Sequence, residues 1–314
     1  MSLLISGSLV YDHIMDFPDS FRNHILPDQI HLLNVCFTVD KLERSFGGTA
    51  GNIAYTVKLL GGEPTIVSVV GSDGQEYLEY LRRVGVNTEY IRVGKRRPTA
   101  AAYITTDIDD NQITAFFNGP LAQAQEADFT PLKDKIRIAL ISPTQKDVMQ
   151  THLRRAKEAG WLTVFDPGQQ IPVFKPEELQ SMIDQADVII GNDYEMRLLQ
   201  ERTGWDTKKI LSVTDMLITT LGDQGSVVTT SDGQAVRVSA CPPRSADDPT
   251  GAGDAYRAGF FTGYARGFPF KTCAQIGSVA ASYAIETYGT QAHQFSLREF
   301  KERYQKTYSE EVNL

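Results

Sequence analysis

The sequence lacks most features that mark secreted, membrane-bound or nucleic-acid-binding proteins. No apolar run approaches the length of a membrane span, and residues 1–5 lack the basic region and cleavage site of a secretory leader. The cysteines Cys36, Cys241 and Cys273 show no metal-like spacing, which favours free thiols in a reducing compartment. The formal net charge of −8 argues against a general binder of nucleic acid or anionic membranes. We therefore expect a cytoplasmic protein.

The motifs of two common phosphoryl-transfer classes are also missing. The sequence contains no G-x-x-x-x-G-K-[ST], and neither H-R-D nor D-F-G. Neither a P-loop enzyme nor a protein kinase is therefore indicated. A small anionic ligand is still compatible with the acidic composition, because backbone amides can bind it locally.

The arrangement of apolar segments predicts an α/β protein. After Pro120 the sequence alternates between strand-like and helix-like segments, which is typical of βαβ units and a largely parallel sheet. Strands are expected at residues 3–10, 65–70, 138–141, 162–165, 187–191 and 216–220. Residues 36–39 have strand character, and residues 99–106 and 112–117 read as a hairpin. The length of 314 residues allows one large domain or two small ones.

The segment Asp248-Pro249-Thr250-Gly251-Ala252-Gly253-Asp254 precedes a run of small and apolar residues. The two glycines permit a tight turn, and the run behind them predicts a closely packed helix. The N–H groups of residues 252–254 would lack intrahelical partners and could bind an anion. A carboxylate in a first helical turn is a common dipole partner, but here Asp254 also stands where a base could accept the proton of an attacking hydroxyl.

These residues resemble the D-T-T-G-A-G-D signature of the ribokinase-like (PfkB) carbohydrate and nucleoside kinases. The resemblance implies a three-layer α/β/α core with a mostly parallel central sheet and a small β-sheet lid. It assigns Gly251, Ala252 and Gly253 to an anion hole and Asp254 to the catalytic base. Pro249 replaces the usual Thr, which removes one backbone donor before the anion hole.

The resemblance extends to the acceptor site. Gly47-Gly48-Thr49-Ala50-Gly51-Asn52 matches the family pattern G-G-x-x-x-N-x-A, and Thr49 is a candidate helix cap. Gly48 and Asn52 would contact the sugar, and the Asn52 amide offers a donor and an acceptor to a diol. Asp12 is expected just past a strand end and would bind sugar hydroxyls, although a turn-forming role is also typical of such an aspartate.

The resemblance also implies a division of the chain. The large domain comprises residues 1–12, 47–94 and 120–314, and its last part carries the ATP site and the catalytic turn. The lid comprises residues 13–46 and 95–119. Phe17-Pro18 and Leu26-Pro27-Asp28-Gln29 resemble the lid of adenosine and other nucleoside kinases, including bacterial ones. Phe37, Phe116 and Phe117 are candidates for stacking on a base, and core packing of the lid explains each about as well.

Two further motifs match the nucleotide side of the family. Asn192-x-x-Glu195 reads as a helix capping box, and the resemblance adds a role in ordering water around Mg²⁺. Thr220, Gly222 and Gly225 match T-x-G-x-x-G, which would lie against ATP, although a tight hairpin is the competing interpretation. Asp248 and the loop at residues 289–291 resemble the elements that hold a monovalent cation, such as K⁺.

The combined prediction is an ATP-dependent nucleoside kinase. The acceptor would be adenosine or a broader set of purine ribonucleosides, phosphorylated on the 5′-hydroxyl to give the 5′-monophosphate and ADP. The alternatives are a sugar kinase of the ribokinase or fructokinase type and a catalytically silent nucleotide sensor. Neither nucleic acid nor membrane is expected as a partner, and either a monomer or a homodimer is compatible with an exposed lid sheet.

Overall fold

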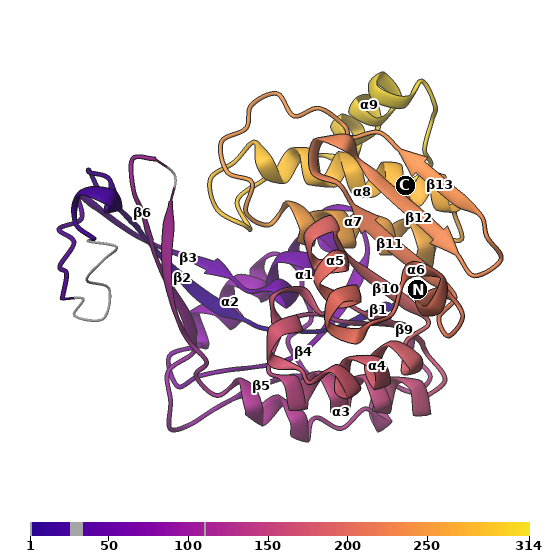
Figure 1. The fold of residues 1–314 in the computed structure, drawn as a ribbon, viewed down its shortest axis with the longest axis horizontal. Coiled ribbons are helices and arrows are strands. Elements are labelled where there is room, and N and C mark those ends of the chain that lie inside the picture. The colour runs from indigo at the N-terminus through magenta and orange to yellow at the C-terminus, as the bar shows by residue number, and fades with distance from the viewer. Residues whose placement is uncertain (1, 26–33, 110) are drawn as a thin grey trace.

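The computed structural model describes residues 2–25, 34–109 and 111–314. Within these residues the chain forms a nine-stranded and a four-stranded β-sheet, which Figure 1 shows as a main body and a projecting smaller sheet. The large sheet contains β1 (Ser2–Ser6), β4 (Glu63–Val70), β5 (Ile91–Val93), β8 (Ile136–Ile141), β9 (Leu162–Phe165), β10 (Val188–Asn192), β11 (Met216–Thr220), β12 (Ser226–Thr230) and β13 (Ala235–Val238). The smaller sheet contains β2 (Val10–Asp16), β3 (Lys41–Gly47), β6 (Ala100–Thr106) and β7 (Gln112–Phe117).

Helices cover the large sheet. They are α1 (Thr49–Leu59), α2 (Gln75–Arg83), α3 (Lys146–Glu158), α4 (Pro176–Gln185), α5 (Asp193–Thr203), α6 (Thr207–Leu211), α7 (Ala252–Ala265) and α8 (Phe270–Ile285), and a further helix, α9 (Leu297–Tyr308), packs on α8. Short 3-10 turns lie at η1 (Phe21–Asn23), η3 (Leu121–Glu126), η4 (Thr130–Leu132), η5 (Gly168–Val173) and η6 (Gly222–Gln224). No helix formed by the described residues is long and apolar enough to cross a bilayer.

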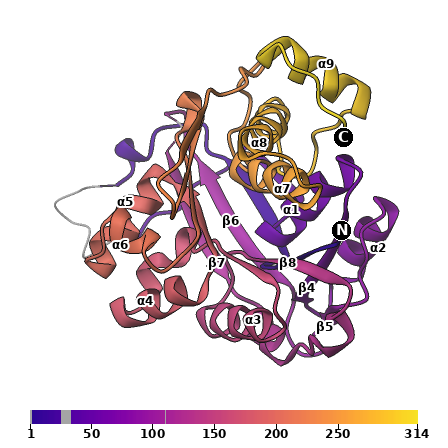
Figure 2. The same cartoon turned by 90° about the vertical axis from the view of Figure 1, so that its right-hand side faces the viewer.

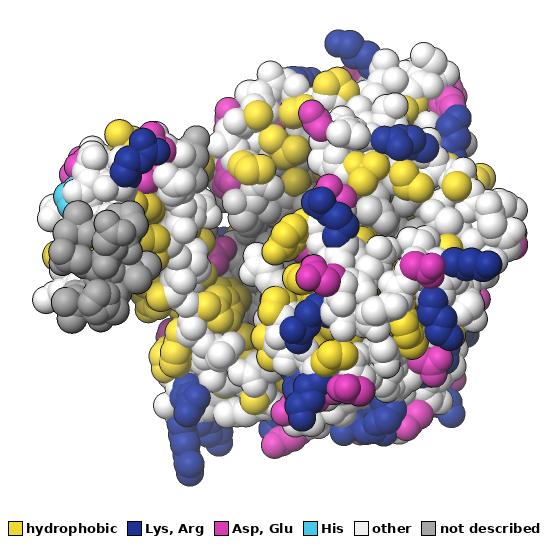
Figure 3. Space-filling model, viewed as in Figure 1, with side chains coloured by type: hydrophobic (Ala, Val, Ile, Leu, Met, Phe, Trp, Pro, Cys, Tyr) yellow, Lys and Arg dark blue, Asp and Glu magenta, His cyan; other side chains and the backbone are white. Residues whose placement is uncertain are grey.

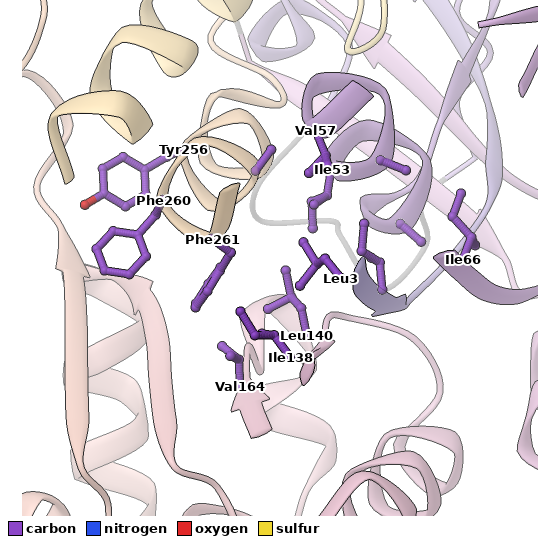
Figure 4. Close-up of a cluster of buried hydrophobic side chains, with 14 of the residues drawn as sticks. Leu3, Ile53, Val57, Ile66, Ile138, Leu140, Val164, Tyr256, Phe260 and Phe261 are labelled. Atoms are coloured by element: carbon purple, nitrogen blue, oxygen red, sulfur yellow. The ribbon is translucent and has the colours of Figure 1, made fainter. Parts of the chain in front are cut away.

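The large sheet forms the middle of three layers, because side chains alternate along its strands and pack against helices on both faces. In β1, Leu3 and Ile5 belong to a buried cluster with α1 and α7, whereas Leu4 belongs to a second cluster with α3 and α4. Figure 4 shows part of the first cluster, with Phe261 of α7 and Ile53 of α1 near the strand residues. Figure 2 shows helices on both sides of the sheet. Because successive strand residues point to opposite faces, a sheet buried on both faces requires continuous apolar strands.

The strand order of the large sheet is β13-β12-β11-β10-β9-β8-β1-β4-β5. All neighbouring pairs from β11 through β5 are parallel, and only β12 and β13 are antiparallel. The carboxyl ends of the parallel strands therefore lie along one edge of the sheet, where open α/β proteins bind ligands.

The smaller sheet has the order β3-β2-β6-β7 and contains the expected hairpin, β6 with β7. Figure 3 shows the surface hollowed between this sheet, on the left, and the main body. The lid boundaries stay a prediction, although β2 already begins at Val10.

Three local expectations are wrong. The strand expected at 3–10 ends at Ser6, because the Ser8 carbonyl leaves the sheet and accepts a hydrogen bond from Ala50 N at 3.1 Å. Residues 36–39 alternate in exposure but form no strand. Thr49 is the first residue of α1 and not its cap; its hydroxyl donates to the Pro143 carbonyl at 3.2 Å.

Candidate active site

The turn before α7 has the conformation that its glycines predict. Gly251 is the N-cap residue with φ of 83°, in the left-handed region that favours glycine. The Ala252 N–H donates to the Pro249 carbonyl at 3.2 Å, so it is not unpartnered as expected. The N–H groups of Gly253 and Asp254 follow in the first turn, where helix geometry provides no partner. Two N–H donors therefore remain for an anion.

Asp254 is held at the start of α7 by a side chain from α1. Its Oδ2 accepts a hydrogen bond from Asn52 Nδ2 at 2.8 Å, across 202 residues of sequence. Burial raises the pKa of Asp254 to about 6, although the nearby Arg257 cation and the Asn52 hydrogen bond lower it. The carboxylate is therefore mostly ionised at neutral pH, which is only slightly above its pKa.

Asp12 lies on the smaller sheet, near enough to Asp254 for the two charges to interact. It is in the middle of β2, not past the end of a strand as expected. A Cβ atom at Gly47 would overlap Asp12 Oδ2, so the glycine leaves room for this carboxylate. Burial, together with the negative charges of Asp254 and Asp248, raises the pKa of Asp12 to about 7.

Gly48 and Asn52 have partly different surroundings from those expected. Gly48 has φ of 88°, and a Cβ atom there would lie 2.6 Å from the Ser8 carbonyl oxygen, so the backbone alone requires a glycine. The Asn52 amide donates one hydrogen bond to Asp254 and accepts another from Gln291 Nε2 at 3.0 Å. One N–H and one lone pair of this amide remain for a ligand.

A buried ion-pair cluster that none of the sequence motifs indicated lies beside the turn. Arg257, one turn beyond Asp254 on α7, donates to Asp166 Oδ1 at 2.6 Å and lies 3.8 Å from Glu195 Oε2. The Arg257 and Asp166 side chains are 8% and 1% exposed. Asp166 follows β9 directly, and this position at the carboxyl end of a strand was the one sequence signal that could have marked it as a site residue. The pairing of Arg257 with Asp166 could not be predicted from the sequence, because 91 residues separate the two.

Asn192 and Glu195 form the capping box that their spacing predicts. Asn192 Oδ1 accepts from Glu195 N at 2.7 Å, and Glu195 Oε2 accepts from Asn192 N at 2.8 Å. Asn192 pairs with Thr220 at the ends of β10 and β11. The capping interpretation is confirmed, and the predicted contact with magnesium-bound water stays a prediction.

Gly222 and Gly225 lie in the hairpin that joins β11 to β12. Both have positive φ, and Leu221 N donates to the Gly225 carbonyl at 2.8 Å. A Cβ atom at Gly225 would also overlap the Val238 carbonyl oxygen. The hairpin interpretation is thus confirmed, and the contact with ATP stays a prediction.

Asp248 connects the turn to the loop after α8. Its Oδ1 accepts from Thr250 N at 2.9 Å and its Oδ2 from Gly289 N at 3.1 Å. The two segments that the sequence predicted to surround a monovalent cation are therefore adjacent. The ion itself stays a prediction.

Comparison with known proteins settles the family. Residues 9–295 match the pfkB family of carbohydrate kinases. The chain belongs to this family. A nucleoside kinase of Methanothermobacter thermautotrophicus is 30% identical over 300 residues, which cover 93% of this chain and 91% of the relative.

Solved structures of similar proteins confirm the ribokinase-like α/β fold, among them a nucleoside kinase of Methanocaldococcus jannaschii described as an archaeal member of the ribokinase family, with a TM-score of 0.86 at 28% identity over 97% of this chain and 98% of its own. Burkholderia thailandensis nucleoside kinase in complex with inosine has a TM-score of 0.88 at 36% identity and covers 98% of this chain and 99% of its own. Its complex with ADP-inosine has a TM-score of 0.86 at 37% identity and covers 99% and 97%. The prediction of an ATP-dependent kinase is confirmed, whereas the location and oligomeric state stay predictions.

The raised pKa of Asp12 predicts a pH-dependent stability gain in the Asp12→Asn variant. An aspartate has a pKa of about 3.9 when unfolded, so the folded protein favours protonated Asp12. The stability contributed by protonation is complete below that value and is lost as pH rises through about 7. Asp12→Asn should raise the unfolding free energy by on the order of 1 kcal/mol at pH 8 and by much less toward pH 4.

Urea unfolding at pH 4 and pH 8 measures this gain. Asp16→Asn is the matched control, because Asp16 lies on the same strand and the same face. An equal effect of both substitutions, or destabilisation by Asp12→Asn at pH 8, would contradict the burial of charge at Asp12.

Proposed function

We propose that the protein is a nucleoside kinase that transfers the γ-phosphoryl group of ATP to the 5′-hydroxyl of adenosine or of a broader set of purine ribonucleosides, giving the 5′-monophosphate and ADP. The observation that carries this proposal is the position of Asp254 in the first turn of α7, where it accepts a hydrogen bond from Asn52 and lies near enough to Asp12 to raise the pKa of that residue. The names of the relatives, and the inosine and ADP-inosine in the Burkholderia structures, support a nucleoside acceptor.

Asp12, Gly48 and Asn52 would orient the ribose. The Asp12 carboxylate would accept hydrogen bonds from the sugar diol, and Asn52 would use its remaining N–H and lone pair. Asp254 would accept the proton of the 5′-hydroxyl as that oxygen attacks phosphorus. Its pKa of about 6 keeps it ionised at neutral pH and close to the pH at which a base works best.

The amides at the start of α7 would receive the negative charge of the transferring group. Phosphoryl transfer depends mainly on positioning and charge stabilisation, so Gly251, Ala252 and Gly253 would act through their backbone. The Ala252 amide could do so only by leaving Pro249, whereas the following amides are available. Thr220 and the hairpin with Gly222 and Gly225 would lie against ATP.

Magnesium fits the oxygen-rich groups on the nucleotide side. Mg²⁺ prefers oxygen ligands and retains several waters, and Glu195 and Asn192 would hold it through such water molecules. When bound, it would neutralise charge on the ATP phosphates. Asp248 offers two carboxylate oxygens beside the Gly289 loop, which suits the proposed K⁺.

The smaller sheet offers one aromatic side chain for a base. Asp12, Ala102 and Phe116 are consecutive cross-strand partners, so their side chains share a face. Two strand spacings, about 10 Å, separate Phe116 from Asp12, with the small Ala102 between them. Phe117 points to the other face. A ribose on Asp12 would thus place a base over Ala102, against Phe116, which is 51% exposed.

Phe37 has a different environment. Its ring lies 4.9 Å from those of both Phe17 and Phe21, so it is used in packing the lid. The motif at residues 26–29 that suggested nucleoside kinases lies outside the described residues. Phe116 is therefore the candidate that we retain for contact with the base.

Acceptor specificity tests the proposed function directly. ATP consumption with Mg²⁺ should be fastest with adenosine, inosine or guanosine, and should be lost with their 5′-deoxy analogues. Asp254→Asn should lower kcat by roughly 10²- to 10⁴-fold, the usual contribution of a general base, while binding is retained. Turnover of ribose or fructose alone would favour a sugar kinase, and no turnover with any acceptor would favour a nucleotide sensor.

Phe116 should distinguish nucleosides from free sugars. Because aromatic stacking on a base contributes about 1–3 kcal/mol, Phe116→Ala should raise the KM for nucleosides roughly tenfold. Any turnover of ribose should be unaffected. Phe117→Ala is the matched control, since its ring is on the opposite face. Similar KM values for both variants would contradict the proposed base position.

A further inference from the structure

A chain of buried hydrogen bonds connects Asp254 to the end of β3. Asn52 Nδ2 donates to Asp254, and Asn52 Oδ1 accepts from Gln291 Nε2 at 3.0 Å. Gln291 Nε2 also donates to the Tyr77 hydroxyl at 2.7 Å, and that hydroxyl donates to the Gly47 carbonyl at 2.6 Å. Asn52, Tyr77 and Gln291 are 5%, 0% and 8% exposed, so water has little access to these bonds.

The groups at the two ends determine the direction of every bond. An ionised Asp254 only accepts, so Asn52 must present its N–H₂ to it and its oxygen to Gln291. The Gly47 carbonyl also only accepts, so the single hydroxyl proton of Tyr77 points to it. Gln291 must therefore donate in both directions. Its N–H₂ group has two hydrogens, and both are used.

Two further observations indicate that Gln291 is placed for these two donors. Its own Oε1 is buried with no hydrogen-bond partner among the described residues, which costs free energy. An apolar side chain that only filled the space would avoid this cost. At Gly51, a Cβ atom would overlap the Tyr77 hydroxyl and lie 2.7 Å from Gln291 Nε2. A glycine at this position of α1 therefore makes room for the Gln291–Tyr77 contact.

We infer that Gln291 is a positioning residue that orients the Asn52 amide toward Asp254 and, through Tyr77, holds Gly47 against Asp12. Gln291 itself would not touch the acceptor or ATP. It would link the proposed base to the proposed sugar-binding carboxylate, which lies against Gly47. The inference rests on the proposed function for the roles of Asp12, Asn52 and Asp254.

The test uses Gln291→Met, which keeps an unbranched side chain of similar length and removes both donors. The Asn52 amide would then be free to turn, and Asp254 would lose a hydrogen bond that lowers its pKa. The other charged groups near Asp254 stay in place. They are Arg257 and Glu195, together with Asp12 and Asp166, the carboxyl groups whose own pKa values are raised by the charge of Asp254. We expect carbon-13 NMR titration to show the Asp254 pKa raised by about one unit.

The same shift should appear in the enzyme kinetics. The acid limb of the pH profile of kcat should move upward by about one unit, which is roughly a tenfold loss of kcat below that limb. Gln294→Met is the matched control, because Gln294 is exposed on the same loop. An unchanged Asp254 titration in folded Gln291→Met, whether or not kcat falls, would overturn the inference.

Tyr77→Phe tests the other end of the hydrogen-bond chain, and it also keeps the inference testable if Gln291→Met does not fold. It removes the hydroxyl that holds Gly47 while Gln291 can still donate to Asn52. The KM for the acceptor should rise several-fold with little change in the Asp254 titration. An unchanged KM, or a loss of kcat alone, would contradict the link to Asp12.

The two proposals fail in different ways. If wild-type protein turns over no nucleoside, the proposed function fails, but the NMR titration of Gln291→Met still tests the hydrogen-bond chain. If nucleosides are turned over and the titration does not move, only the positioning role of Gln291 fails.

Discussion

The site depends on keeping a carboxylate ionised where burial disfavours its charge. Removing Asp254 from water raises its pKa, and the opposing contributions come from the Arg257 cation and the Asn52 hydrogen bond. Arg257 is itself buried and can remain there because Asp166 and Glu195 pair with it. The proposed base, the buried ion pair and the amide of α1 therefore form one electrostatic unit, in which each member affects the protonation of the others.

The fold assembles this unit from distant segments. Asp166 and Glu195 follow the carboxyl ends of the adjacent parallel strands β9 and β10, and Asp254 comes from the N-terminus of a helix packed on the same sheet. The smaller sheet supplies Asp12 from the other side of the hollow in Figure 3. The main body and the smaller sheet thus face each other across the site, and an acceptor bound between them would be shielded from the water that would compete with it.

Local signals predicted the fold and the glycine turns, because spacing of apolar residues and of glycines reports backbone conformation directly. The capping box of Asn192 and the alternation after Pro120 are of this kind. Contacts between distant residues were not predictable in this way. The sequence around Arg257 gives no sign of its ion pair with Asp166. Gln291 lies 239 residues from Asn52, so their hydrogen bond could not be predicted either. The alternating residues 36–39 do not form a strand, because none of the strands in the described part of the chain pairs with them, and a single segment does not reveal its pairing.

A crystal structure with a purine nucleoside and a non-hydrolysable ATP analogue is the most direct test of the proposed roles of Asp254 and Asp12. We predict that the 5′-oxygen lies within about 3 Å of the Asp254 carboxylate, the normal distance for proton abstraction. The ribose diol should bind Asp12, and the γ-phosphoryl group should face the amides of Gly253 and Asp254. A ribose bound away from Asp12, or a 5′-oxygen that does not reach Asp254, would contradict these roles.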